Sequence, residues 1–256
     1  GRVRSKPIDE LKEELHKLSE AGFAEVVLVG INLSAYGTDI GLSICDAVEL
    51  ADSMNFKRVR LGSLEPDHIT DEVIKRLSKL QSFCPQFHIS LQSGCDNTLK
   101  AMNRHYSAEE YSELCKKLRA SFPDAAITTD IMVGFPTESE EDFAENVRFA
   151  QKIGFEKVHV FPYSPREGTK AAKMPQIEKS VKEKRSHIMI EKTEEIRREF
   201  LKSQIGKIVE VLFETRHSDG YIEGYTRNYT PVKVKGELPC GEILKVKITA
   251  VDGDFC

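Results

Sequence analysis

Along the first 165 residues, short apolar runs of strand type alternate with amphipathic segments of helical period. This alternation is typical of βα units that share a parallel sheet. The strands recur about every 30 residues, the length of one such unit, so either an open doubly wound sheet or a barrel is expected. The predicted strands span residues 25–30, 58–62, 86–91, 127–134 and 157–163, and the predicted helices span 8–20, 43–54, 70–80, 108–121 and 139–153.

Capping residues support several of these helices. Thr70 and Thr137 are the clearest N-cap candidates. Glu140 lies three residues after Thr137, and the pair has the spacing of a capping box.

The pattern changes after Pro175. Residues 178–204 form one charged segment in which Met189, Ile196 and Phe200 recur at helical spacing, which predicts a helix leaving the main domain. Four strand-like runs follow at 207–214, 219–226, 230–236 and 241–251, typical of a small antiparallel barrel or sandwich. We therefore expect a βα core over 1–176, a connecting helix over 177–205 and a β domain over 206–256.

Composition restricts the class of protein. The 256 residues are 40% hydrophobic and 30% charged, as in a globular chain with a real core. The formal charge of -4 gives no general attraction for nucleic acid, and no apolar run approaches the roughly 20 residues of a membrane span. A cytoplasmic protein without a membrane partner is expected. The cysteines are scattered, which favours buried reduced thiols over a disulfide framework or a metal site. They are Cys45, Cys84, Cys95, Cys115, Cys240 and Cys256.

All five predicted strands of the core end on polar or turn-forming residues. In parallel βα proteins the functional site lies beyond the carboxyl ends of the strands. Loop ends are polar in most proteins, but five such ends on one rim favour a site. The candidates are Asn32, Ser63, Glu65, Gln92, Ser93, Asp130, Gly134, Phe135, Pro136 and the run from Tyr163 to Arg166.

Three of the polar residues also have structural explanations. Asp130 lies in an otherwise apolar strand, where an unpaired carboxylate is costly, so a partner or a ligand is expected. His88 alternates with apolar neighbours, and a core histidine is favoured over a site residue. Glu65 precedes Pro66, which favours extended backbone, and a ligand contact and a surface turn both stay open. Walker, dinucleotide-binding and zinc-protease motifs are absent from the sequence.

Several blocks of sequence together resemble the radical S-adenosylmethionine (SAM) methylthiotransferases, in family order over residues 1–174. They are Gly30-Ile31-Asn32-Leu33-Ser34-Ala35-Tyr36-Gly37, Arg58-x-Arg60-x-x-Ser63-x-Glu65-Pro66, His88-Ile89-Ser90-Leu91-Gln92-Ser93-Gly94, Met102-Asn103-Arg104, Asp130-Ile131-Met132-Val133-Gly134-Phe135-Pro136 and Phe161-x-Tyr163-Ser164-x-Arg166-x-Gly168-Thr169. The β domain resembles a TRAM domain, an RNA-binding module, with Gly224-Tyr225-Thr226-Arg227-Asn228-Tyr229 at its centre.

The resemblance implies an α/β fold: a partial parallel (β/α) barrel of radical-SAM type, truncated at its first strand, followed by a small all-β TRAM domain. It implies a tRNA methylthiotransferase that adds a methylthio group to the adenine ring of N6-threonylcarbamoyladenosine next to the anticodon. The same reaction on isopentenyladenosine, and a non-catalytic RNA-binding scaffold, are the alternatives. The implied partners are SAM and the tRNA anticodon stem-loop.

The resemblance also assigns site residues and cofactors. SAM would lie near Asn32, Ser63, Glu65, Gln92, Ser93, Asp130, Gly134, Phe135 and Pro136. Candidates for nucleotide or cofactor contacts are Arg2, Arg4, Arg104, Tyr225, Arg227, Asn228 and Tyr229. In the family, a four-iron four-sulfur cluster reduces SAM to a deoxyadenosyl radical, and a second such cluster supports sulfur insertion.

The chain departs from the family at the cluster. The family's ligands are Cys-x-x-x-Cys-x-x-Cys, just upstream of the segment that is Arg2-Val3-Arg4-Ser5 here, and no three cysteines of this sequence have that spacing. We therefore expect a fragment that begins after the cluster loop, binds neither cluster and is inactive by itself. The catalytic residues stay unassigned, and no metal ligand is predicted within the chain.

Overall fold

The computed structural model describes residues 2–256, which divide into two compact units. Unit 1 contains the chain up to His88 together with Leu118–Ala126 and Leu201–Cys256. Unit 2 contains Ile89–Lys117 and Ile127–Phe200. No helix of the described residues is long and apolar enough to cross a membrane.

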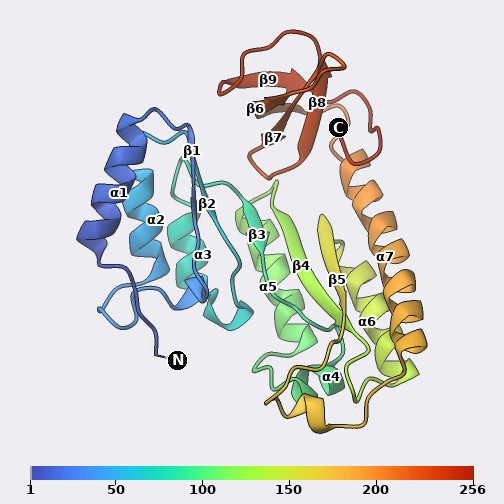
Figure 1. The fold of residues 1–256 in the computed structure, drawn as a ribbon. Coiled ribbons are helices and arrows are strands. Elements are labelled where there is room, and N and C mark those ends of the chain that lie inside the picture. Colours follow the sequence, from blue (N-terminus) through green and yellow to red (C-terminus); the bar gives the residue numbers. More distant parts are fainter. Residues whose placement is uncertain (1) are drawn as a thin grey trace. The chain divides into compact units, whose positions relative to one another are not determined.

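The N-terminal part of unit 1 consists of βα units (Figure 1). Its strands β1 and β2 pair in parallel, with Glu25 opposite Arg58. Ser43 and Asp46 form a capping box that begins α2, and the Thr70 hydroxyl accepts from Val73 N at 3.3 Å, which confirms the predicted cap of α3. The elements are α1 (Ile8–Glu20), β1 (Glu25–Leu28), η1 (Leu33–Ala35), α2 (Ile44–Asp52), β2 (Arg58–Leu61), η2 (Pro66–His68), α3 (Asp71–Leu77) and β3 (Gln86–His88).

The C-terminal part of unit 1 is a four-stranded antiparallel sheet in the order β8-β7-β6-β9. Its core consists of Val211, Phe213, Ile222 and Val232. Gly224 is required where β7 meets β6, because a Cβ there would lie 2.2 Å from Leu212 O. The strands are β6 (Ile208–Arg216), β7 (Tyr221–Thr226), β8 (Pro231–Lys235) and β9 (Ile243–Lys247). We call this part the β domain.

Unit 2 is built on the parallel pair β4–β5, in which Asp130 lies opposite His159. The segment after β3 runs alongside β4, since Ile89 N donates to Thr128 O at 3.0 Å. Figure 1 shows α6 and α7 beside β5. The elements are α4 (Asp96–Ala101), α5 (Ala108–Ser121, whose last turn belongs to unit 1), β4 (Ala126–Val133), α6 (Glu140–Ile153), β5 (Lys157–Pro162), η3 (Ala171–Lys173) and α7 (Lys179–Lys202).

Several local predictions need correction. The N-cap of α6 is Ser139, which forms a capping box with Asp142, so the predicted Thr137–Glu140 box is wrong. Helix α4 has no counterpart among the predicted helices, because its six residues are too few to display a period. Four cysteines are buried and free as expected, whereas Cys240 is exposed in the loop after β8.

Candidate functional site

The loops that follow β1 and β2 meet in unit 1. Glu65 N donates to Ser34 Oγ at 2.8 Å, which joins the loop after β2 to η1. This is the convergence expected of parallel strands. Of the predicted residues here, Asn32 and Ser63 are exposed and Glu65 is half-buried.

The N-terminal segment lies against the loop after η1. Ser5 N donates to Asp39 Oδ2 at 3.0 Å, and Ser5 Oγ accepts from Gly37 N at 2.8 Å. Arg2 and Arg4, predicted to contact nucleotide or cofactor, are exposed on this anchored segment.

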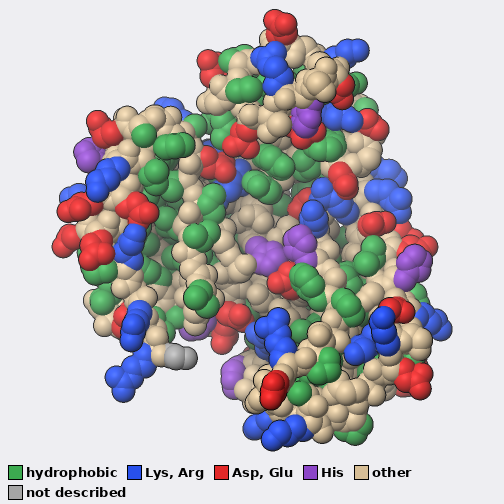
Figure 2. Space-filling model, viewed as in Figure 1, with side chains coloured by type: hydrophobic (Ala, Val, Ile, Leu, Met, Phe, Trp, Pro, Cys, Tyr) green, Lys and Arg blue, Asp and Glu red, His purple; other side chains and the backbone are tan. Residues whose placement is uncertain are grey.

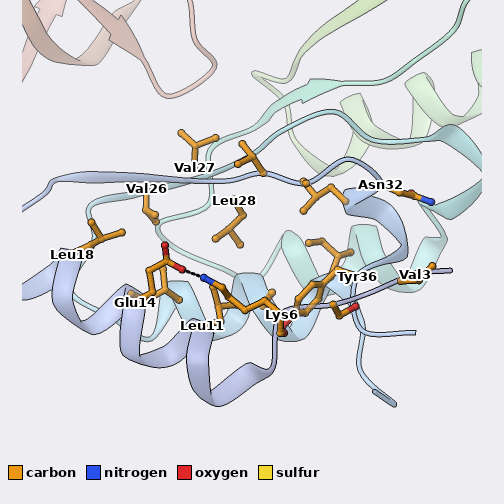
Figure 3. A pocket seen from close by; sticks show the side chains of 17 residues that line it. Val3, Lys6, Leu11, Glu14, Leu18, Val26, Val27, Leu28, Asn32 and Tyr36 are labelled. Carbon is orange, nitrogen blue, oxygen red and sulfur yellow. Dashed lines mark hydrogen bonds and ion pairs between the residues drawn. The ribbon is translucent and has the colours of Figure 1, made fainter. Parts of the chain in front are cut away.

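A cavity of about 390 Å³ lies between this segment, α1 and β1 (Figure 3). Figure 3 shows Val26 and Leu28 of β1 pointing toward α1, whose Leu11 and Leu18 face them. Asn32 is the one predicted site residue among those that line it. The cavity is mainly apolar, so the described part of the chain offers little polar chemistry here.

The predicted residues after β3 are fixed by backbone contacts within unit 2. Gln92 N donates to Asp130 O at 2.9 Å, and Gln92 O accepts from Met132 N at 2.9 Å. Ser93 is fully buried, and its Oγ accepts from Cys95 N at 3.2 Å. Gln92 and Asp130 therefore come from adjacent chain segments, as their strand ends predicted.

Strained backbone occurs at predicted site residues in both units. Among the described residues, three that are not glycine have positive φ: Gln92 at 67°, Asn103 at 58° and Tyr229 at 66°. A left-handed conformation costs an L-residue about 1–2 kcal/mol, and such residues concentrate at functional sites. Gln92 and Tyr229 are predicted site residues, whereas Asn103 is the left-handed residue that ends α4, with Arg104 N donating to Leu99 O at 2.9 Å. The assignment of Gln92 and Tyr229 to a site stays a prediction.

The loop Gly134-Phe135-Pro136 is held by a buried ion pair that no sequence pattern predicted. Gly134 N donates to Glu138 Oε2 at 2.6 Å, and the same oxygen accepts from Arg185 NH1 of α7 at 2.8 Å. Glu138 and Arg185 are each 4% exposed. In the sequence, Glu138 is indistinguishable from the acidic residues that open α6, and Arg185 is one cation of a charged helix.

Lys182 completes this contact between α7 and the loop. Gly134 has φ of 71°, and a Cβ there would lie 2.3 Å from Lys182 Cγ. Lys182 Nζ donates to Tyr163 O at 3.1 Å. The loop therefore has room for glycine only, and α7 determines its position.

A second cavity, of about 550 Å³, brings several predicted residues of unit 2 together. Gln92, Arg104 and Phe135 line it, with Met132 and Tyr163. The Phe135 and Tyr163 rings meet edge to face at 5.2 Å. Three cations and no carboxylate line this cavity within the described chain; the cations are Lys100, Arg104 and Lys170.

Tyr163, which lines this cavity, carries a buried hydroxyl without a hydrogen-bond partner. Tyr163 is 8% exposed, and its Oη has no hydrogen-bond partner. A buried hydroxyl without a partner is costly, so a polar group bound in the cavity would satisfy it. The cavity thus offers aromatic and apolar walls that suit a ring, with polar side chains at Gln92 and Tyr163.

The thiol and carboxylate next to this region do not form a reactive pair. Burial raises the pKa of Cys95 to about 11, so its thiol, which donates to Asp142 Oδ1 at 3.1 Å, is protonated at neutral pH. Burial alone would raise the pKa of Asp142, but bonds from Ser139, Asn97 and Cys95 outweigh it and lower the pKa to about 2. Both groups have structural roles at the start of α6.

The predicted RNA-binding residues of the β domain differ in exposure. Tyr229 is 42% exposed and stacks on Tyr225 with a centroid distance of 4.4 Å. Asn228 is 6% exposed, and Arg227 is half-buried. From residue 206 onward there are seven Lys and Arg against eight Asp and Glu, and Figure 2 shows the two signs interspersed over the visible face of this domain. Stacking, rather than phosphate attraction, suits this surface.

The described residues do not fit an iron–sulfur cluster. None of their His, Cys, Asp and Glu side chains form a group of three or more that would hold a metal. Burial also raises the pKa of Cys45 and of Cys84, which disfavours the thiolate that an iron ligand needs.

His88 is half-buried, so the interpretation as a core histidine is not supported. Its carbonyl accepts from Leu64 N at 2.8 Å, which places it beside the loop after β2.

The chain is similar to known proteins in both of its parts. The Radical SAM superfamily matches residues 1–150, and the TRAM domain matches residues 202–255. Threonylcarbamoyladenosine tRNA methylthiotransferase MtaB of Thermotoga maritima is 36% identical over 98% of this chain and 58% of its own length. The tRNA-2-methylthio-N(6)-dimethylallyladenosine synthase of Acetivibrio thermocellus is also 36% identical, over 98% of this chain and 54% of its own length.

Among solved structures, coproporphyrinogen III oxidase (HemN) from Escherichia coli shares the fold. Its TM-score is 0.54 at 14% sequence identity, covering 76% of this chain and 45% of that protein. The chain spans a little over half the length of the curated relatives named above.

Proposed function

This chain belongs to the radical SAM superfamily and carries a TRAM domain, and on that premise we propose that the protein is a tRNA methylthiotransferase. It adds a methylthio group to the adenine ring of N6-threonylcarbamoyladenosine next to the anticodon. The observation that carries the proposal is similarity to tRNA methylthiotransferases over 98% of the chain, across both domains.

The cavity of unit 2 supports a nucleoside ligand. Phe135 and Met132 offer apolar contact to a ring, and Gln92 and the unpartnered Tyr163 hydroxyl offer polar contacts. Bound SAM and a reduced cluster supply the radical chemistry. The contribution of this chain is to bind and orient, through the strained Gln92 and the loop from Gly134 to Pro136. The described residues contain no group of three or more His, Cys, Asp and Glu side chains that could hold the cluster.

The charge of this cavity favours the threonylcarbamoyl substrate over the isopentenyl one. A threonylcarbamoyl group ends in a carboxylate, whereas an isopentenyl group is apolar. Lys100, Arg104 and Lys170 line the cavity, and no Asp or Glu is among its lining residues, which suits an anionic group. Isopentenyladenosine stays the second candidate, because a relative of equal identity is named for the dimethylallyl reaction.

The test is to express the full-length protein in cells that lack their own enzymes of this type and to analyse tRNA nucleosides by mass spectrometry. We expect methylthio-threonylcarbamoyladenosine. Methylthio-isopentenyladenosine would move the assignment to the second candidate. If neither product appears while the protein binds iron and SAM, the methylthiotransferase proposal fails and an RNA-binding scaffold is favoured.

Two variants link the product to the cavity. Tyr163→Phe removes the hydroxyl and keeps the ring, so we expect weaker binding of the ligand and about tenfold lower turnover, the effect of one hydrogen bond. Lys157→Ala is the control, because Lys157 is exposed at the amino end of β5, whereas Tyr163 follows the carboxyl end of that strand. Equal activity of the two variants would remove Tyr163 from the site.

A further inference from the structure

Two arginines of β2 are buried where an apolar side chain would be expected. Arg58 is 1% exposed and Arg60 is 2% exposed. Glu25 of β1 lies 2.8 Å from Arg60 Nε, an ion pair that neutralises one of the two cations. A buried guanidinium is costly unless its N–H groups are satisfied, so the remaining donors need partners.

Four of these donors bond to backbone carbonyls of the β domain, whereas Arg58 Nε has no partner among the described residues. Arg58 NH1 donates to Tyr225 O at 2.7 Å and NH2 to Glu210 O at 2.9 Å. Arg60 NH1 donates to Arg227 O at 2.8 Å and NH2 to Thr226 O at 2.9 Å. Each planar guanidinium thus bridges two carbonyls, a geometry that lysine cannot reproduce.

The β domain also donates in the opposite direction. Arg227 NH2 donates to Gln81 O at 2.6 Å and to Phe83 O at 2.8 Å, beside the start of β3. Asn228 Nδ2 donates to Asp124 O at 2.9 Å. All of these residues belong to unit 1. The carbonyls are spread along the chain from Gln81 to Arg227, so the bonds fix orientation as well as proximity.

The stacked tyrosines adjoin the same contact. The guanidinium of Arg60 lies over the ring of Tyr229 at 4.8 Å, and Tyr229 stacks on Tyr225. The strained backbone of Tyr229, with φ of 66°, places this ring against Arg60. Tyr229 keeps 42% of its surface exposed, so it stays accessible to RNA at this contact.

We propose that Arg58, Arg60, Arg227 and Asn228 form a latch that fixes the β domain against β2 and the start of β3. Its function is to hold RNA bound at Tyr229 in one position relative to the β1–β2 pair; this second part rests on the proposed function. The latch assigns Arg227 and Asn228 to domain docking in place of direct RNA contact.

The test measures backbone hydrogen exchange in the full-length protein. Arg227→Ala removes two bonds at a half-buried position, and Arg60→Lys keeps the charge but loses the two-carbonyl bridge. We expect exchange about tenfold faster at Thr230 and Cys84, whose amides lie next to the latch. Arg216→Ala is the matched control, because Arg216 donates to Leu238 O at 2.8 Å inside the β domain; it should leave both amides unchanged.

RNA binding by the same variants separates the latch from a direct contact. If Arg227 acts in the latch, Arg227→Ala and Arg227→Lys both accelerate backbone exchange. The salt dependence of RNA affinity then stays as in the parent. For a phosphate contact, exchange stays as in the parent, and Arg227→Ala alone lowers the slope of log affinity against log salt by about one. The second result would overturn the latch.

The two proposals fail separately. Unchanged exchange in Arg227→Ala and Arg60→Lys overturns the latch even when the parent modifies tRNA. Faster exchange in these variants supports docking even when no methylthio nucleoside is formed, in which case only the proposed function and the RNA-holding role fail.

Discussion

At the scale of single residues, two glycines of unit 2 share a left-handed backbone but differ in the space around them. Gly134 has φ of 71° and Gly154 has φ of 66°, but of the two only Gly134 has a neighbour within 4 Å of the position that a Cβ would take, namely Lys182. Gly154→Ala should cost about 1–2 kcal/mol of unfolding free energy, from the left-handed conformation alone. Gly134→Ala should cost about 3 kcal/mol, because Lys182 must also move.

Urea unfolding of the two variants checks this difference. Adding Lys182→Ala to Gly134→Ala should recover part of the lost stability, whereas adding it to Gly154→Ala should recover none. Equal losses in the two single variants would show that Lys182 does not restrict the loop.

The carboxylate of Asp142 gives a prediction for pH. Its pKa of about 2 in the folded chain is below the ordinary value of 3.8, so the charged form stabilises the fold above about pH 4. That stabilisation, about 2 kcal/mol, is lost as the pH falls from about 4 to about 2. Asp142→Asn should be less stable than the parent at pH 6, and the difference should shrink toward pH 3. A difference that stays constant in urea unfolding over this range would contradict the shift.

At the scale of elements, α7 is joined to the Gly134 loop by the buried pair Glu138–Arg185. Arg185→Met leaves a buried carboxylate without its cation, and we expect a loss of about 3–5 kcal/mol. The double variant Glu138→Gln, Arg185→Met should lose less than the sum of the single variants. Lys192→Ala is the control on the same helix, because its ion pair with Glu195 is exposed and should contribute less than about 1 kcal/mol. Additive losses in a thermodynamic cycle would show that the pair is not coupled.

The sequence predicted the strands and long helices because apolar runs of strand length alternate with segments of helical period. It predicted β4 and α6 within two residues at either end, since both have many buried positions. It missed Ser139 as the N-cap of α6, because Thr137 and Ser139 are each followed three residues later by an acidic residue, the spacing of a capping box. It also missed the pair Glu138–Arg185, whose members are 47 residues apart. The spacing of apolar residues along the chain carries no information about which distant charged residues pair.

At the scale of the whole molecule, strand order predicted which loops would converge within each unit, but resemblance supplied the identity of the ligands. The bond between Ser34 and Glu65 and the cavity shared by Gln92 and Phe135 agree with the predicted strand ends. The strain at Gln92 and the unpartnered Tyr163 hydroxyl have no sequence signal, because both depend on packing. The assignment of the individual residues to SAM or RNA stays a prediction.

Residues 1–256 lack a complete set of accessible thiols for an iron–sulfur cluster. Cys45, Cys84, Cys95 and Cys115 are buried in the folded chain, which leaves Cys240 and Cys256 as the thiols with access to solvent. Two thiols do not complete the ligand set of a four-iron cluster. Anaerobic reconstitution of residues 1–256 with iron and sulfide should therefore give no more charge-transfer absorbance than the double variant Cys240→Ser, Cys256→Ser gives. The full-length protein should give a strong band under the same conditions. Stoichiometric iron in that double variant would show that the buried cysteines rearrange to ligate a cluster, and would contradict both the packing argument and the expectation that this chain is inactive by itself.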